Sequence, residues 1–290
     1  MERVRRLAVL LVVLLVAGCA HRRSAAEVRV QDVAVGDARF SVRWWSGDDR
    51  AARQVLRALE TAAARAQRWG RLSHEVTITI HPDHAALEAA VDRAGYDWLR
   101  GWARFQTVDL QSPRSWKERA KDHRVVELLA HELTHCAMYQ RAGDERTWMH
   151  KEIPRWFSEG VASVTAGQGY RHGGPEDLRA FYLSKVSGAG DGAPGRAGEP
   201  ARREARGGDP MVDVDPDAMD EAKAAVVYGA AHHAVELLLR RYGEQRVRGV
   251  VERMGAGRRF PAAFKEAIGV TDAEFAAEFR GYVLSEGWRR

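Results

Sequence analysis

Cysteine is scarce in this sequence, and its scarcity excludes one class of protein. There are only two cysteines among 290 residues, Cys19 and Cys136. Two cysteines cannot form the network of disulfides that holds small secreted domains together. The chain must therefore fold around a hydrophobic core, and its 45% of hydrophobic residues is an ordinary share for a globular protein.

The sequence also lacks a strong excess of charge of one sign. Its 45 lysines and arginines are nearly balanced by 40 aspartates and glutamates, which leaves a formal net charge of +5. Nucleic-acid-binding proteins usually concentrate basic residues on one face. No internal repeat, glycine-rich phosphate loop or Ser/His/Asp order stands out. We therefore expect no nucleic-acid partner, and the sequence leaves the oligomeric state open.

The apolar run near the N-terminus is too short to cross a membrane as a helix. It covers the eleven residues from Leu7 to Ala17. At roughly 1.5 Å per residue such a helix is about 16 Å long, against about 30 Å for the hydrocarbon core of a bilayer. Three arginines precede the run and small residues follow it. This order is typical of a secretory signal.

The end of this segment, Val16-Ala17-Gly18-Cys19, resembles a bacterial lipoprotein signal. The resemblance implies that residues 1–18 are removed, that Cys19 is lipidated, and that 19–27 forms a tether to the membrane. Removal of 1–18 lowers the net charge to +3 and leaves Cys136 as the free thiol. Ala20, where an aspartate would retain such a protein at the inner membrane, implies the outer membrane, facing the periplasm. An ordinary signal or an uncleaved anchor remains the alternative.

The pattern after the tether predicts strands and helices in alternation. Two extended runs separated by Gly36-Asp37 predict a hairpin. Further along the chain, apolar residues at helical spacing predict helices, and short alternating runs predict strands. The expected elements are strands at 28–35, 38–45, 75–80 and 102–110, and helices at 48–69 and 82–91.

The pattern in the second half of the chain predicts mainly helices. Helices are expected at 119–141, ending at Gly143, at 153–165, and over 221–288 with breaks at glycines. Seven glycines and three prolines among residues 187–210 predict a mobile loop. We therefore expect an α+β fold of two parts. Residues 28–145 would form a small mixed sheet packed on a helix, and 146–290 a helical subdomain.

One pentapeptide in the predicted helix 119–141 carries chemistry. It is His131-Glu132-Leu133-Thr134-His135, an H-E-x-x-H pattern. Residues four apart lie on one face of a helix, so His131 and His135 can bind the same zinc ion at about 2.0–2.1 Å. Glu132 lies beside them as a general base. Apolar neighbours indicate that this helix is buried, where unsatisfied polar groups are costly.

A second stretch makes the likeness to a family specific. The sequence Trp156-Phe157-Ser158-Glu159-Gly160 begins 21 residues after His135. This combination resembles the gluzincin metallopeptidases, and most closely the peptidase MA-like group. The resemblance implies a zincin-like fold, one Zn²⁺ per chain held by His131, His135 and Glu159, and Glu132 as the catalytic base. An exposed helical glutamate is the alternative for Glu159.

The resemblance also suggests a residue that stabilises the oxyanion. In many gluzincins a tyrosine or histidine after the ligand glutamate does so, and Tyr228, with His232 behind it, is the candidate here. Core packing is the equal alternative for Tyr228. Some relatives orient a ligand histidine with an acid four residues after the glutamate, but Ser163 occupies that place. Cys136 follows a ligand but points about 100° away from it on a helix, so we expect it to pack in the core.

The predicted function is hydrolysis of peptide bonds by Glu132-assisted attack of zinc-bound water. The partners would be a peptide or protein substrate and, through the lipid, a membrane of the bacterial cell envelope. Two alternatives remain: a lipid-anchored binding or scaffold protein without turnover, and a zinc amidase acting on a cell-wall substrate.

Overall fold

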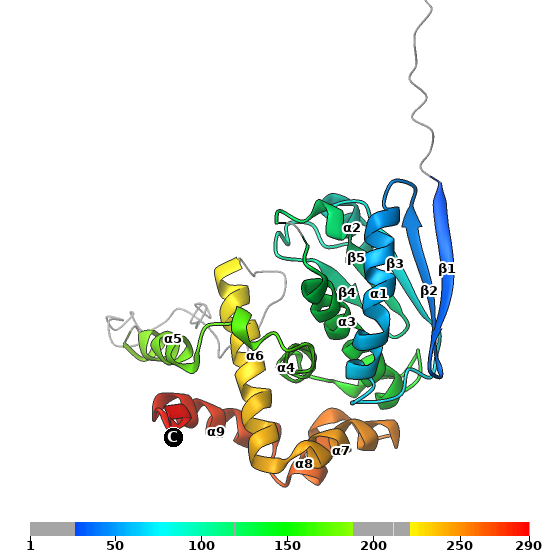
Figure 1. Ribbon diagram of the computed structural model, residues 1–290. Coiled ribbons are helices and arrows are strands. Elements are labelled where there is room, and N and C mark those ends of the chain that lie inside the picture. Colours follow the sequence, from blue (N-terminus) through cyan, green and yellow to red (C-terminus); the bar gives the residue numbers. More distant parts are fainter. Residues whose placement is uncertain (1–26, 119, 188–210, 212–220, 290) are drawn as a thin grey trace, which may run out of the picture.

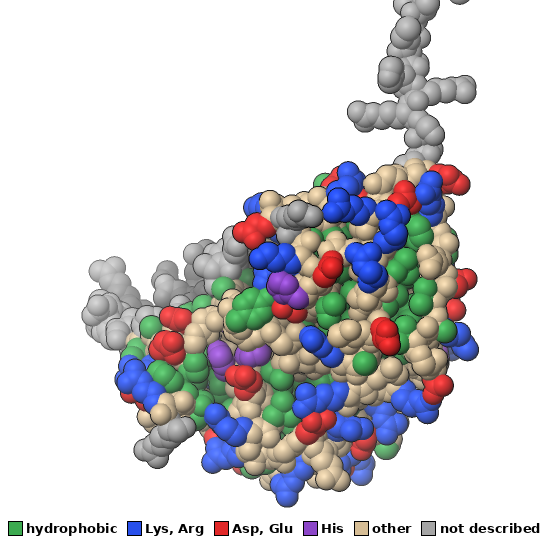
Figure 2. Space-filling view, in the orientation of Figure 1, with side chains coloured by type: hydrophobic (Ala, Val, Ile, Leu, Met, Phe, Trp, Pro, Cys, Tyr) green, Lys and Arg blue, Asp and Glu red, His purple; other side chains and the backbone are tan. Residues whose placement is uncertain are grey.

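The computed structural model describes residues 27–118, 120–187, 211 and 221–289. The proposed signal, Cys19 and nearly all of the glycine-rich stretch 187–210 lie outside these residues, so those expectations stay predictions. Within the described part, no helix is both long and apolar enough to span a bilayer. Figure 2 shows basic and acidic side chains interspersed on the face in view, in keeping with their near balance in the sequence.

A five-stranded mixed sheet forms the first half of the molecule (Figure 1). Its spatial order is β1-β2-β3-β5-β4. The inner pairs β2/β3 and β3/β5 are parallel, whereas β1/β2 and β4/β5 are antiparallel. The strands are β1 (Val28–Val35), β2 (Ala38–Trp45), β3 (Val76–His81), β4 (Gly101–Ala103) and β5 (Thr107–Gln111).

The predicted single strand at 102–110 is wrong. The chain instead makes a tight antiparallel hairpin, with β4 as the edge strand and β5 inside the sheet. The amide of Arg104 donates to the carbonyl of Thr107 at 2.8 Å and closes the turn. The turn has no glycine-based signal, so the alternation of side chains suggested one continuous strand.

Helices make up most of the remaining described chain. The predicted breaks at Gly243, Gly255 and Gly269 are confirmed as helix boundaries, while α5 was not predicted. The helices are α1 (Asp49–Ala66), α2 (His84–Val91), α3 (Asp122–Ala142), α4 (Arg155–Ala166), α5 (Pro175–Ser187), α6 (Glu221–Tyr242), α7 (Glu244–Gly255), α8 (Phe260–Ile268) and α9 (Asp272–Leu284). Short 3-10 turns lie at Pro113–Ser115, Trp148–Lys151, Gly169–Arg171 and Gly287–Arg289.

Two hydrophobic cores meet at α3 and α4. The first packs α1 and one side of α3 against the sheet, with Val42, Ile78 and Leu133 fully buried. The second is helical and centres on aromatic rings, among them Phe157 of α4 and Phe264 of α8, whose ring centroids lie 6.5 Å apart. In Figure 1, α4 lies between the sheet side and the helices α6 to α9.

This architecture confirms the predicted α+β class, with a mixed sheet packed on the motif helix and a mainly helical second part. The division at residue 145 stays a prediction. Because α3 and α4 are held by two cores at once, they supply a rigid frame for side chains at their junction.

Candidate metal centre

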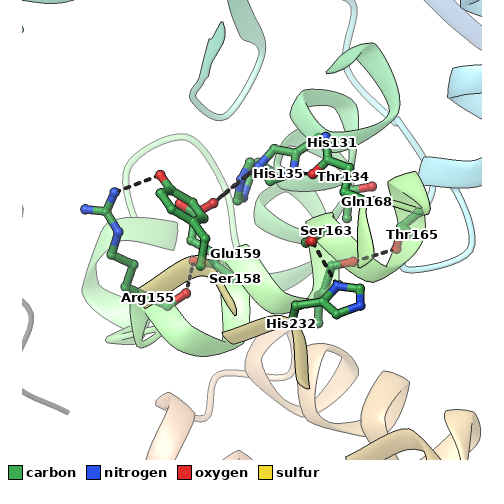
Figure 3. Close-up of polar contacts among 12 residues, drawn as sticks. His131, Thr134, His135, Arg155, Ser158, Glu159, Ser163, Thr165, Gln168 and His232 are labelled. Carbon is green, nitrogen blue, oxygen red and sulfur yellow. Dashed lines mark hydrogen bonds and ion pairs between the residues drawn. The ribbon is translucent and has the colours of Figure 1, made fainter. Parts of the chain in front are cut away.

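Three side chains converge where α3 meets α4 (Figure 3). The Nε2 atoms of His131 and His135 lie 3.3 Å apart. The Oε2 atom of Glu159 is 3.2 Å from the first of these nitrogens and 3.6 Å from the second. Ligands that surround one zinc ion tetrahedrally at about 2.0–2.2 Å stand about 3.3–3.6 Å from each other. The donor atoms therefore have the identity and the spacing of a zinc site.

Burial makes this cluster costly without a cation. The side chains of His131, His135 and Glu159 are only 12%, 7% and 15% exposed. Burial by itself would raise the pKa of Glu159, but the two histidines reverse this effect and hold its pKa well below the usual value. A metal ion binds an ionised carboxylate and neutral imidazoles, so it would take the place of the protons through which the histidines lower this pKa. The alternative of an exposed glutamate is excluded.

In each of the two histidines, the ring nitrogen that points away from the cluster, Nδ1, has a partner of its own. His131 Nδ1 donates to Gln168 Oε1 at 3.0 Å, and His135 Nδ1 lies 3.4 Å from the hydroxyl of Tyr139. Because an amide oxygen only accepts, His131 carries its hydrogen on Nδ1 and its Nε2 lone pair faces the site. His135 has the same tautomer when the Tyr139 hydroxyl accepts from its Nδ1. Such contacts are typical of histidines that bind metals.

Sequence reasoning missed Gln168 and Tyr139. The expected place of the orienting acid, Ser163, does not touch a ligand and instead contacts His172 and His232. Gln168 takes that role from the end of α4, after Gly167 reverses the chain with a φ of 74°. The glycine signalled the end of the helix, but nothing in the sequence indicated which side chain the reversal would bring back.

Glu132 lies beside the ligands and under the edge of the sheet. Burial is the main reason that the pKa of Glu132 rises to about 7, with His131 opposing the shift. Gly101 of β4 covers it so closely that a Cβ built at position 101 would be 2.5 Å from Glu132 Oε1. The arrangement holds a carboxylate, able to accept a proton near neutral pH, next to the donor set.

The ligands open into a cavity of about 510 Å³. Its walls come from β4, α3, α4 and α6, and from the segment before β4. Lining side chains include Trp98, Trp102, Glu132, Arg171 and Tyr228. A cavity of this size is typical of small-molecule and peptide sites, and the donor set forms part of its wall.

Tyr228 lines this cavity, but His232 does not. Arg155 Nη2 donates to the Tyr228 hydroxyl at 3.0 Å, which leaves the phenolic proton free to point elsewhere. Burial raises the pKa of Tyr228, so the hydroxyl stays protonated. The side chain of His232 is 4% exposed, and its Nδ1 lies 2.9 Å from the hydroxyl of Ser163. The geometry favours Tyr228 over His232, and the role itself stays a prediction.

Cys136 is buried in the sheet core, one helical turn after Glu132, and does not line the cavity. Its Sγ lies 3.1 Å from the carbonyl oxygen of Arg104, in the β4–β5 turn. Burial raises the pKa of this thiol. The expectation of a packing role is confirmed, and Cys136 is not among the clustered ligands.

Comparison with known proteins finds matches among solved structures, all of them distant, and none at the level of sequence. No protein-family model and no curated protein matches the sequence. An M1 zinc metallopeptidase from Deinococcus radiodurans matches with a TM-score of 0.41 and 15% identity over 89% of this chain and 52% of its own. An aminopeptidase N family protein from Idiomarina loihiensis matches with a TM-score of 0.38 and 11% identity over 89% of this chain and 42% of its own.

This chain therefore spans about half the length of these proteins, or less. At such TM-scores, the function has to be argued from the residues of this chain.

Proposed function

We propose that this protein is a zinc-dependent peptidase that hydrolyses peptide bonds. The observation that carries the proposal is the convergence of His131, His135 and Glu159 to within 3.2–3.6 Å, beside the buried carboxylate of Glu132. Two imidazoles and one carboxylate, with the neighbouring cavity open to substrate, form the donor set of a catalytic zinc site. One Zn²⁺ is expected at this centre.

A bound zinc ion would supply Lewis acidity, which polarises a carbonyl and lowers the pKa of water toward about 7. Glu132 accepts the proton of the attacking water and passes it to the leaving amine. Tyr228, oriented by Arg155, donates a hydrogen bond from its hydroxyl to the oxygen on which negative charge develops. The cavity walls formed by β4 and α6 hold the substrate in reach of these groups.

Glu132→Gln tests this mechanism. The variant keeps the shape of the side chain but cannot take a proton, so we expect hydrolysis of a peptide mixture to fall at least about 10²-fold. Zinc content should be unchanged, because Glu132 is not a ligand. Glu252→Gln is the control, since Glu252 is an exposed residue of α7 paired with Arg141. Full activity in Glu132→Gln would contradict the mechanism.

Substrate assays separate the alternatives. A chain that binds zinc but cleaves wall fragments and no peptide would be an amidase of the cell wall. A chain that binds no zinc at this centre and turns over neither substrate would be a binding or scaffold protein.

The place of action is proposed from the sequence. The lipoprotein-like segment that ends at Cys19 supports anchoring to the bacterial cell envelope, on the periplasmic side of the outer membrane. Labelling with a radioactive fatty acid followed by membrane fractionation tests this. Label in the wild type and none in Cys19→Ala is expected, whereas equal label in both chains would contradict lipidation at this cysteine.

A further inference from the structure

A second group of metal-binding side chains lies on α6, outside the candidate centre. It consists of His232, His233 and Glu236, and the potential ligand atoms lie within 4.8 Å of one another. His232 Nε2 is 3.5 Å from Glu236 Oε1, and His233 Nδ1 is 3.1 Å from Glu236 Oε2. Each oxygen of the Glu236 carboxylate thus faces one histidine, at distances close to the 3.2–3.6 Å between Glu159 and its two histidines.

The opposite nitrogen of each histidine is already occupied. His233 Nε2 lies 2.9 Å from the carbonyl oxygen of Gly173, and because a carbonyl can only accept, this nitrogen carries the hydrogen. The lone pair of neutral His233 is then on Nδ1 and faces Glu236. His232 Nδ1 contacts the hydroxyl of Ser163, which also contacts His172. When Ser163 donates to His172, His232 donates from Nδ1 and its Nε2 lone pair faces Glu236.

In the absence of an ion, protonated His233 donates from Nδ1 to Glu236. A cation can take the place of that proton, and the lone pairs of the neutral imidazoles then bind it together with the carboxylate. Histidines that bind metals have this arrangement, in which the outer nitrogen donates to a carbonyl or hydroxyl and the inner nitrogen faces the ion. Gly169 keeps the inner nitrogen of His232 accessible, because a Cβ at position 169 would lie 2.7 Å from Nε2. Two imidazoles and a carboxylate suit zinc.

We propose that His232, His233 and Glu236 form a second zinc site. The side chains of the two histidines are 4% and 13% exposed, while that of Glu236 is 53% exposed, so the site opens to solvent and water can complete the coordination. The site joins α6 to α4 through Ser163 and to the end of the segment from Gln168 to Gly173 through the carbonyl of Gly173. Since Gln168 orients His131, an ion bound here steadies the support of the first centre.

Zinc stoichiometry tests the second site without any need for activity. Equilibrium dialysis of the full chain should give two zinc ions per wild-type chain and one per Glu236→Gln chain. His131→Ala should also retain one, because its loss affects the first centre. Glu252→Gln, which removes a half-exposed helical glutamate next to an arginine, should retain two. Zinc should raise the unfolding temperature of His131→Ala and leave that of the His131→Ala/Glu236→Gln double variant unchanged.

The outcomes separate this proposal from the proposed function, on which it does not rest. One zinc per wild-type chain that survives Glu236→Gln and disappears in His131→Ala would overturn the second site and leave the peptidase proposal standing. One zinc per wild-type chain that survives His131→Ala and disappears in Glu236→Gln would support the second site and count against the first.

Discussion

Gly101 of β4 lies directly on the carboxylate of Glu132 of α3. A Cβ at position 101 would be 2.5 Å from Oε1 and 2.8 Å from Cδ of Glu132. The glycine thus lets the edge strand approach the proposed base, so that the base and the strand lining the cavity occupy fixed positions relative to each other.

Gly101→Ala should therefore displace the base. Because Glu132 is buried, its carboxylate has to move away from the added methyl group, and a displacement of about 1 Å can cost about 10²-fold in kcat. Zinc content and fold should be retained, as measured by metal analysis and circular dichroism. Gly281→Ala is the matched control, since no atom lies within 4 Å of a Cβ there. Equal activity of the two variants would contradict the proposed role of this contact.

Gln168→Ala should weaken zinc binding at the first centre. The substitution removes the acceptor that fixes the tautomer of His131, and loss of such a contact typically lowers metal affinity about 10–100-fold. Competition with a chelating dye measures the zinc affinity. The measurement is made in a chain that also carries Glu236→Gln, so that only the first centre binds zinc. Gln54→Ala, which removes an amide bonded to Ala120 far from the ligands, is the control. Unchanged affinity in Gln168→Ala would show that the contact does not support the ligand.

Tyr228→Phe should lower kcat and kcat/KM together. The variant keeps the ring in the cavity wall but removes the proton proposed for the oxyanion, an effect of about 10²–10³-fold for a single donor. Steady-state kinetics on a peptide substrate measure it. Tyr242→Phe at the far end of α6, where the hydroxyl bonds Glu278, should leave both constants unchanged. A rise in KM with kcat unchanged would instead mean that Tyr228 only binds substrate.

The sequence was most informative where chemistry depends on local spacing. The pair His131 and His135 is fixed by the helical repeat, so the pentapeptide alone predicted that both face one ion. Glu159 lies on another helix, and it was found through the resemblance to a family. The boundaries of β1 and β2 also followed from a local pattern, alternation on both sides of a tight turn.

Features that depend on long-range packing could not be predicted. The partner of His131 is Gln168, brought back by a reversal at Gly167, and a glutamine after a helix has no sequence signature as an orienting group. The contact between Gly101 and Glu132 joins an edge strand to a helical residue 31 positions later in the chain, and the strand itself was predicted as part of a longer one. Such relations depend on how the layers pack rather than on local propensity.

Gly160, next to the ligand Glu159, sets the distance between α4 and α6. A Cβ at position 160 would be 2.2 Å from the carbonyl oxygen of Ala231 and 2.5 Å from Cγ2 of Val235. Both neighbours are fully or almost fully buried, so the helices have to separate to admit a methyl group.

Overpacking of this kind costs about 1–3 kcal/mol. Gly160→Ala should therefore lower the free energy of unfolding by about that amount in urea titrations, although alanine is the better helix former by about 1 kcal/mol. Gly281→Ala, on an open face of α9, should be neutral or stabilising. Because the shift moves the backbone beside Glu159, zinc affinity should fall as well. A Gly160→Ala chain as stable as Gly281→Ala would show that α4 and α6 are not packed this closely.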